Sequence, residues 1–154
     1  MFHIYNGESL RFSQNGYKES AWFREGLTNY LALCALKEAK LITINEENLQ
    51  IKKHAELYRD YQTKSKKDEN ISYHLGFFMA MTLDQHLRQS SQNKLHLTGF
   101  WRFLATSSLW EREHDNDSLG LAIELYSGLN YRDFIRRYAE NSETLPIERL
   151  FISN

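Results

Sequence analysis

The sequence predicts an all-α, bundle-like domain, and three observations indicate this class. Apolar residues recur at helical spacing in most segments. The chain contains one proline, Pro146, and seven glycines, so few positions break a helix. At 154 residues, with 42% hydrophobic and 14% aromatic residues, it has the length and the core material of one domain. We therefore expect residues 1–154 to form a single helical domain.

The first half of the chain predicts two long helices. The first covers about residues 18 to 40 and carries its apolar residues on one broad face. Thr43 followed by Glu46 reads as a capping box, and a second, more polar helix runs from there to about Tyr61. A charged segment, residues 64 to 69, follows and is expected to be a solvated loop.

The second half predicts a central helix and several shorter ones. Between Ile71 and Arg88, residues 75 to 81 are apolar on nearly every side, which predicts the most buried element of the domain. Thr98 is the expected cap of the next helix, and a charged connection over residues 111 to 117 follows it. Shorter helices are expected over three further ranges, namely 118–126 with a stop at Gly128, 131–138 and 146–151.

Composition excludes several classes of function. A formal net charge of -1 is no polyelectrolyte signature and argues against a nucleic-acid partner. No run approaches the roughly 20 apolar residues of a membrane span, so we expect no membrane partner and a soluble protein, with cytoplasm and periplasm both open. The single cysteine, Cys34, lies in an apolar run and is interpreted as a small core residue.

Glu25 is the first candidate for chemistry, because it sits among bulky apolar residues of the segment Trp22–Tyr30. An unpaired buried carboxylate is costly, so Glu25 needs a partner if it faces inward. The alternative is an exposed or salt-bridged glutamate. His3 is the second candidate, because zinc peptidases place two histidines one helical turn apart. The alternative for His3 is a stray histidine near a chain terminus.

Three segments in one order resemble a known family. They read Phe-His-Ile-Tyr-Asn-Gly at 2–7, Trp-Phe-Arg-Glu-Gly-Leu-Thr-Asn-Tyr at 22–30 and Ser-Tyr-His-Leu-Gly at 72–76. Together they resemble landmarks of the glycyl aminopeptidases, which are zinc metallopeptidases of the gluzincin type. Residues 128–134 extend the resemblance in weaker form, so that it covers essentially the whole chain.

The resemblance implies a fold, a metal and three site residues. The fold is the C-terminal half of a thermolysin-like catalytic domain, and the reaction of the complete enzyme is zinc-assisted hydrolysis near a peptide N-terminus. His3 and Glu25 map onto zinc ligands, and Tyr73 maps onto a tyrosine that stabilises the transition state. Tyr73 taken alone is equally a core or interface tyrosine. Where the family often has lysine before the glycine, this chain has Leu75.

The first histidine of the zinc motif and its general base do not occur ahead of His3 in the sequence. We therefore expect zinc to belong to the complete enzyme, and this chain alone neither to bind it stoichiometrically nor to cleave peptides. The rival interpretation is a non-catalytic helical module that self-associates as a homo-oligomer or binds a partner on the surface of a missing N-terminal lobe. An exposed apolar patch beside Trp22 and Tyr73 would favour that rival. A third possibility is a mis-started gene, which an in-frame His-Glu pair ahead of Met1 would reveal.

The remaining histidines and arginines receive simpler interpretations. His74 lies beside Tyr73 in the sequence and is a candidate pocket residue. The other histidines lack ligand spacing and are expected to be surface or capping residues: His54, His86, His96 and His114. Three arginines of the helix expected over 131–138 are interpreted as a solvated face: Arg132, Arg136 and Arg137.

Overall fold

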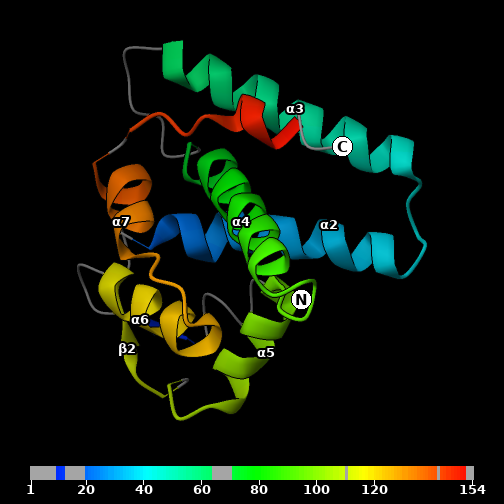
Figure 1. The fold of residues 1–154 in the computed structure, drawn as a ribbon. Coiled ribbons are helices and arrows are strands. Elements are labelled where there is room, and N and C mark those ends of the chain that lie inside the picture. The colour runs from blue at the N-terminus through cyan, green and yellow to red at the C-terminus, as the bar shows by residue number, and fades with distance from the viewer. Residues whose placement is uncertain (1–9, 13–19, 64–70, 110, 142, 152–154) are drawn as a thin grey trace.

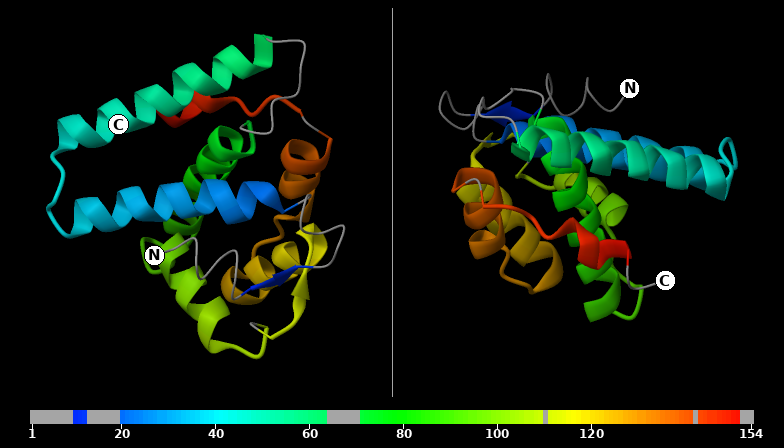
Figure 2. Two further views of the ribbon diagram at one scale, coloured as in Figure 1. Left: turned by 180° about the vertical axis from the view of Figure 1, so that it is seen from behind. Right: turned by 90° about the horizontal axis from the view of Figure 1, so that it is seen from above.

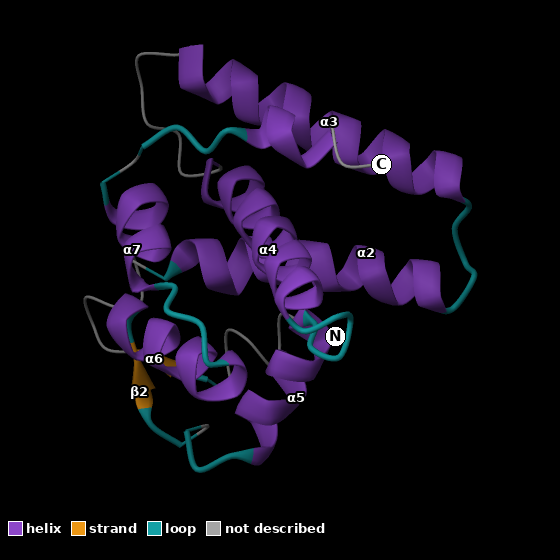
Figure 3. Cartoon of the chain, in the orientation of Figure 1, coloured by secondary structure: helices purple, strands orange, loops and turns teal. Residues whose placement is uncertain are grey.

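The computed structural model describes residues 10–12, 20–63, 71–109, 111–141 and 143–151, and it confirms the all-α class (Figure 3). Within these residues the strands are a two-residue parallel pair, in which Arg11 lies opposite Glu113 and Phe12 opposite His114. The elements in chain order are β1 Arg11–Phe12, η2 Trp22–Leu27, α2 Thr28–Glu38, α3 Ile44–Thr63, α4 Ile71–Ser90, α5 Leu97–Thr106, β2 Glu113–His114, α6 Asn116–Ser127, α7 Arg132–Ile135, η3 Arg136–Glu140 and η4 Ile147–Phe151.

Helix α4 is the centre of the fold, as its apolar run predicts. It packs against η2, α2, α3 and α5, and Figures 1 and 2 show it crossing the hairpin of α2 and α3. Phe77, Phe78, Met79 and Ala80 are fully buried on consecutive faces of α4. A helix that is apolar all round needs neighbours on every side, and these elements provide them.

Helix α3 is attached by a narrow apolar stripe. Its capping box forms as expected, with the Thr43 N–H donating to Glu46 Oε2 at 2.7 Å and the Glu46 N–H to Thr43 Oγ1 at 3.2 Å. Only Ala55 and Tyr58 of α3 are buried. The Leu145 N–H donates to the Tyr58 hydroxyl at 2.8 Å, which ties the C-terminal segment and η4 to α3 (Figure 1).

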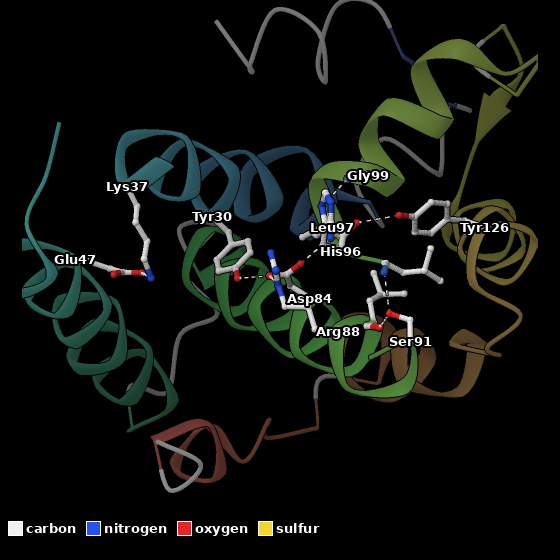
Figure 4. A network of polar contacts seen from close by, with 12 residues as sticks. Tyr30, Lys37, Glu47, Asp84, Arg88, Ser91, His96, Leu97, Gly99 and Tyr126 are labelled. Carbon is white, nitrogen blue, oxygen red and sulfur yellow. Dashed lines mark hydrogen bonds and ion pairs between the residues drawn. The ribbon is translucent and has the colours of Figure 1, made fainter. Parts of the chain in front are cut away.

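A buried carboxylate joins α2, α4 and α5 (Figure 4). Asp84 on α4 accepts the Tyr30 hydroxyl at 2.9 Å, the Arg88 Nε–H at 2.8 Å and the Leu97 backbone N–H at 2.6 Å. The same environment raises the pKa of the Tyr30 phenol, first through burial. Burial also raises the pKa of the half-buried Cys34 thiol to about 11, so this thiol is protonated at neutral pH.

Several expected boundaries are wrong, because local hydrogen bonds begin the helices earlier. His96, not Thr98, caps α5, because its Nδ1 accepts the Gly99 N–H at 3.0 Å. Asp115 forms a capping box with Ser118, so α6 begins inside the expected charged connection. Gly128 ends α6 with a φ of 72°, as predicted, because a left-handed residue there favours glycine.

The C-terminal helices are present but less regular than expected. The helix expected over 131–138 is divided into α7 and a π-helical turn, η3, and the piece expected over 146–151 is a 3-10 helix. The three arginines of this region are exposed as predicted, and they pair with acidic neighbours: Arg132 with Glu124, Arg136 with Asp133, and Arg137 with Glu143.

Among the residues that the structure describes, no helix has the length and hydropathy needed to cross a bilayer. The expected loop over residues 64 to 69 lies outside the described residues.

Candidate functional site around the Glu25 turn

The segment that carries Glu25 is a π-helical turn. Residues Trp22–Leu27 form η2, and α2 continues directly from it at Thr28. A π-helical turn places an extra residue in the helix compared with α-helical geometry, and such turns are frequent at functional sites. The expected first long helix is therefore present, and its first turn, Trp22–Leu27, is π-helical.

Two glycines bring η2 and α4 into direct backbone contact. A Cβ atom on Gly26 would lie 2.2 Å from the backbone of Gly76, and one on Gly76 would lie 2.2 Å from the carbonyl oxygen of Trp22. Only glycine tolerates such an approach at either position. The segment 22–30 and the segment 72–76, recognised separately in the sequence, therefore meet at their glycines.

The other side chains of the 22–30 segment hold the turn in place. Trp22 is buried and donates its Nε1–H to Asn116 Oδ1 at 2.9 Å, while Asn116 Nδ2 donates to Glu140 Oε1 at 3.1 Å. The Thr28 hydroxyl donates to the Arg24 carbonyl oxygen within the same helix. With Tyr30 bonded to Asp84, this segment is connected to α4 and α6.

Glu25 itself lies at the edge of the core with an ion-pair partner. Its side chain is 20% exposed, and Arg24 Nη1 lies 3.6 Å from Glu25 Oε1. The Arg24 guanidinium also stands over the Phe12 ring, 5.8 Å from its centroid. A nearby cation stabilises a partly buried carboxylate, so Glu25 has the partner that its surroundings require. Whether it ligates a metal stays a prediction.

Tyr73 lies in the first turn of α4, three residues before Gly76, and is 36% exposed. Residues three apart share one side of a helix, so Tyr73 follows the side of α4 that meets η2. Its exposure argues against the core interpretation. Its catalytic role stays a prediction, and His3 lies outside the described residues.

The described residues do not make a complete zinc site. Within them no three histidine, cysteine, aspartate or glutamate side chains gather closely enough to hold a metal ion. Catalytic zinc takes three protein ligands, and Glu25 offers one carboxylate. Any zinc site that uses Glu25 therefore needs donors from elsewhere.

The histidine predictions are partly wrong. His96 caps a helix as expected, and His86 is exposed. His114 is buried, and its Nε2 lies 2.9 Å from the Leu109 carbonyl oxygen; burial lowers its pKa. His54 on α3 and His74 on α4 face each other with their Nδ1 atoms 3.0 Å apart, so both are half-buried partners in a helix contact.

Asp84 and Asn116 are not among the residues predicted from the sequence. Asp84 had a usable signal, because an acid in the helix that carries the apolar run 75–81 must find buried donors. Asn116 had no such signal, since it belongs to a run of polar residues, 114–118. Its hydrogen bond with Trp22 is evident only in the folded structure.

Comparison with known families is consistent with this arrangement. Searches of curated proteins and of solved structures return no match. A family of peptidases matches residues 2–127, which include all three recognised segments and the glycine contact that joins two of them. The chain belongs to the M61 glycyl aminopeptidase family.

Proposed function

We propose that this chain is the C-terminal helical portion of an aminopeptidase-like zinc metallopeptidase, and that these 154 residues alone do not hydrolyse peptides. One observation carries the proposal: none of the six histidines is directly followed by glutamate, so the His-Glu-x-x-His motif is absent from the sequence. That motif supplies two of the zinc ligands and the general base.

Within the complete enzyme, Glu25 and His3 are two of the three protein ligands, and Tyr73 donates a hydrogen bond to the oxyanion. The glycine contact between η2 and α4 supports this assignment, because it brings the segments of Glu25 and Tyr73 together. The hydrogen bonds of Trp22, Thr28 and Tyr30 support it as well, since a ligand needs a rigid backbone.

The zinc content of the purified chain and its activity test the inactivity. After dialysis against zinc, we expect well under one zinc per chain by elemental analysis. We also expect no chelator-sensitive release of N-terminal residues from peptides. One bound zinc per chain, or hydrolysis that a chelator abolishes, would overturn the proposal.

A two-residue extension tests the assigned ligands directly. Adding His-Glu ahead of Met1 creates His-Glu-Met1-Phe2-His3, which completes the motif in the chain's own register. We expect zinc affinity to rise at least about tenfold over a matched Ala-Ala extension, because a third ligand is supplied. Glu25→Gln and His3→Ala should each remove most of the gain. A gain that survives Glu25→Gln would show that Glu25 is not a ligand.

A second candidate function is the non-catalytic module, and one observation favours it. Leu41 and Ile44, at the tip of the α2–α3 hairpin, are 71% and 70% exposed. The expected patch beside Trp22 does not include that residue, which is buried. Sedimentation equilibrium distinguishes the candidates: self-association that Leu41→Lys and Ile44→Lys abolish supports the module, and a concentration-independent monomer contradicts this route to self-association.

A further inference from the structure

We propose that His54 and His74 form a proton-sensitive contact that releases helix α3 from helix α4 in mild acid. The two Nδ1 atoms, one from each helix, are 3.0 Å apart. At that distance one Nδ1–H donates to the other Nδ1, so the pair needs one ring of each tautomer. The proposal is independent of the peptidase assignment.

Aromatic packing holds the His54 and His74 rings together and shields them partly from water. Phe77 stacks on His54 with centroids 4.1 Å apart and planes 8° apart, and Tyr61 stacks on His74 at 5.6 Å and 16°. This packing withholds water from the imidazoles, which disfavours their charged forms. Burial, then His74 and Lys53, lower the pKa of His54 to about 4, and burial and Lys53 lower the pKa of His74.

The surrounding charges do not offset this effect. On α3 the cation Lys53 acts against protonation of both rings. On α2, Tyr30 packs edge-on against Phe77 and gives its hydroxyl to Asp84 on α4. On η4, Glu148 pairs with Arg59 of α3. Among the described residues, none of these carboxylates is hydrogen-bonded to either imidazole.

Protonation of both rings breaks the contact. A first proton can bind Nε2 of the donor ring and leave the Nδ1–H···Nδ1 bond intact. The second must bind the accepting Nδ1, which turns the bond into two opposed N–H groups and two adjacent cations. Like charges at this distance repel strongly in a partly dry contact. The doubly protonated pair is therefore incompatible with the closed contact.

Helix α3 is the element that this repulsion would move. Its other contacts include the buried Ala55 and Tyr58, the partly buried Ile51, the ring contact of Tyr58 with Phe78, and the bond from Leu145 to Tyr58. Ion pairs join Arg59 to Glu148 and Glu47 to Lys37. Exposed ion pairs contribute little. A helix attached by such a narrow stripe opens locally before the whole domain unfolds.

Hydrogen exchange of the full chain tests the proposal. Compared at pH 7.5 and pH 5.0 after correction for intrinsic exchange, α3 should lose protection by at least about tenfold relative to α6, because the second proton of the pair binds only in the open state. His54→Gln with His74→Gln should remove this α3-specific loss, and the matched control His86→Gln on α4 should retain it. An equal loss in α3 and α6, or a loss that persists in the double variant, would overturn the proposal.

A titration of the unmodified chain covers the case in which the double variant does not fold. Proton NMR of the imidazole C2–H signals, assigned with the single variants or by nuclear Overhauser contacts to Phe77 and Tyr61, should give pKa values below 6.5 for both histidines. A value of 6.5 or more for either ring would contradict the proposal.

Discussion

At the scale of single residues, two glycines determine how closely η2, which carries Glu25, packs against α4. Gly26 and Gly76 allow the backbones of η2 and α4 to touch, and neither can gain a side chain without separating the helices. A helical glycine usually costs about 1 kcal/mol relative to alanine. Here glycine stabilises the fold relative to alanine, because the backbone contact between η2 and α4 leaves no room for a Cβ atom.

Gly26→Ala should therefore destabilise the domain, although alanine is the better helix former. We expect a loss of about 3 kcal/mol or more, because a Cβ would lie 2.2 Å from the Gly76 backbone, which cannot give way. Urea unfolding at pH 7.5 measures it. Gly120→Ala is the matched control, because its Cβ would meet the movable Arg132 side chain at 2.9 Å and should cost far less. Equal losses for the two variants would show that the backbone contact is not tight.

A second prediction at this scale concerns Asp84. Asp84→Asn keeps the shape of the side chain but removes the charge that Arg88 and the Tyr30 hydroxyl address. We expect a loss of about 1 to 3 kcal/mol, because a buried charge-assisted network becomes partly unsatisfied. Asp133→Asn, at an exposed pair with Arg136, should cost about 0.5 kcal/mol or less and is the control. Chemical denaturation that ranks the two variants equally would contradict a structural role for Asp84.

At the scale of elements, sequence periodicity predicts the long helices better than their ends. The apolar run over 75–81 and the Thr43–Glu46 capping box were sufficient for α4 and the start of α3, because burial pattern and capping are local properties. His96 and Asp115 were missed as caps, since several neighbouring polar residues compete for the same role. The π-helical turns were not predictable, because apolar spacing does not report which carbonyl a given N–H reaches.

In the candidate site, too, local sequence motifs predict some residues, and contacts between distant residues are not predicted. Glu25 and Tyr73 were selected by motif, and the structure adds that their segments meet at Gly26 and Gly76. The partners that hold the turn, Asn116 and Asp84, are 94 and 54 residues from Trp22 and Tyr30. Pairings over such separations depend on the folded topology and leave no periodic signal in one sequence.

At the scale of the whole molecule, four histidines with lowered pKa values link stability to pH. The pKa values of His54, His74, His86 and His114 are all lowered, with burial as the largest cause in each. An unfolded histidine titrates near 6.5, so below that pH the unfolded chain binds more protons than the folded one. Their contribution to stability is therefore complete above about pH 6.5 and declines as the pH falls toward the lowered values of the folded state.

We accordingly expect the urea midpoint of unfolding to fall steadily from pH 7.5 to pH 5.0, with little change in the slope of the transition. This window lies above the titration of the carboxylates Glu46 and Asp115, whose pKa values are lowered by bonds from Thr43 and Ser118. Histidines therefore dominate the dependence. The His54→Gln, His74→Gln double variant should show a shallower fall, because two of the four proton-binding differences are gone. A urea midpoint that is constant or rises toward pH 5.0 would contradict this prediction. It would mean that the folded chain binds protons as readily as the unfolded chain. His54 and His74 would then be more solvated than their packing against Phe77 and Tyr61 implies.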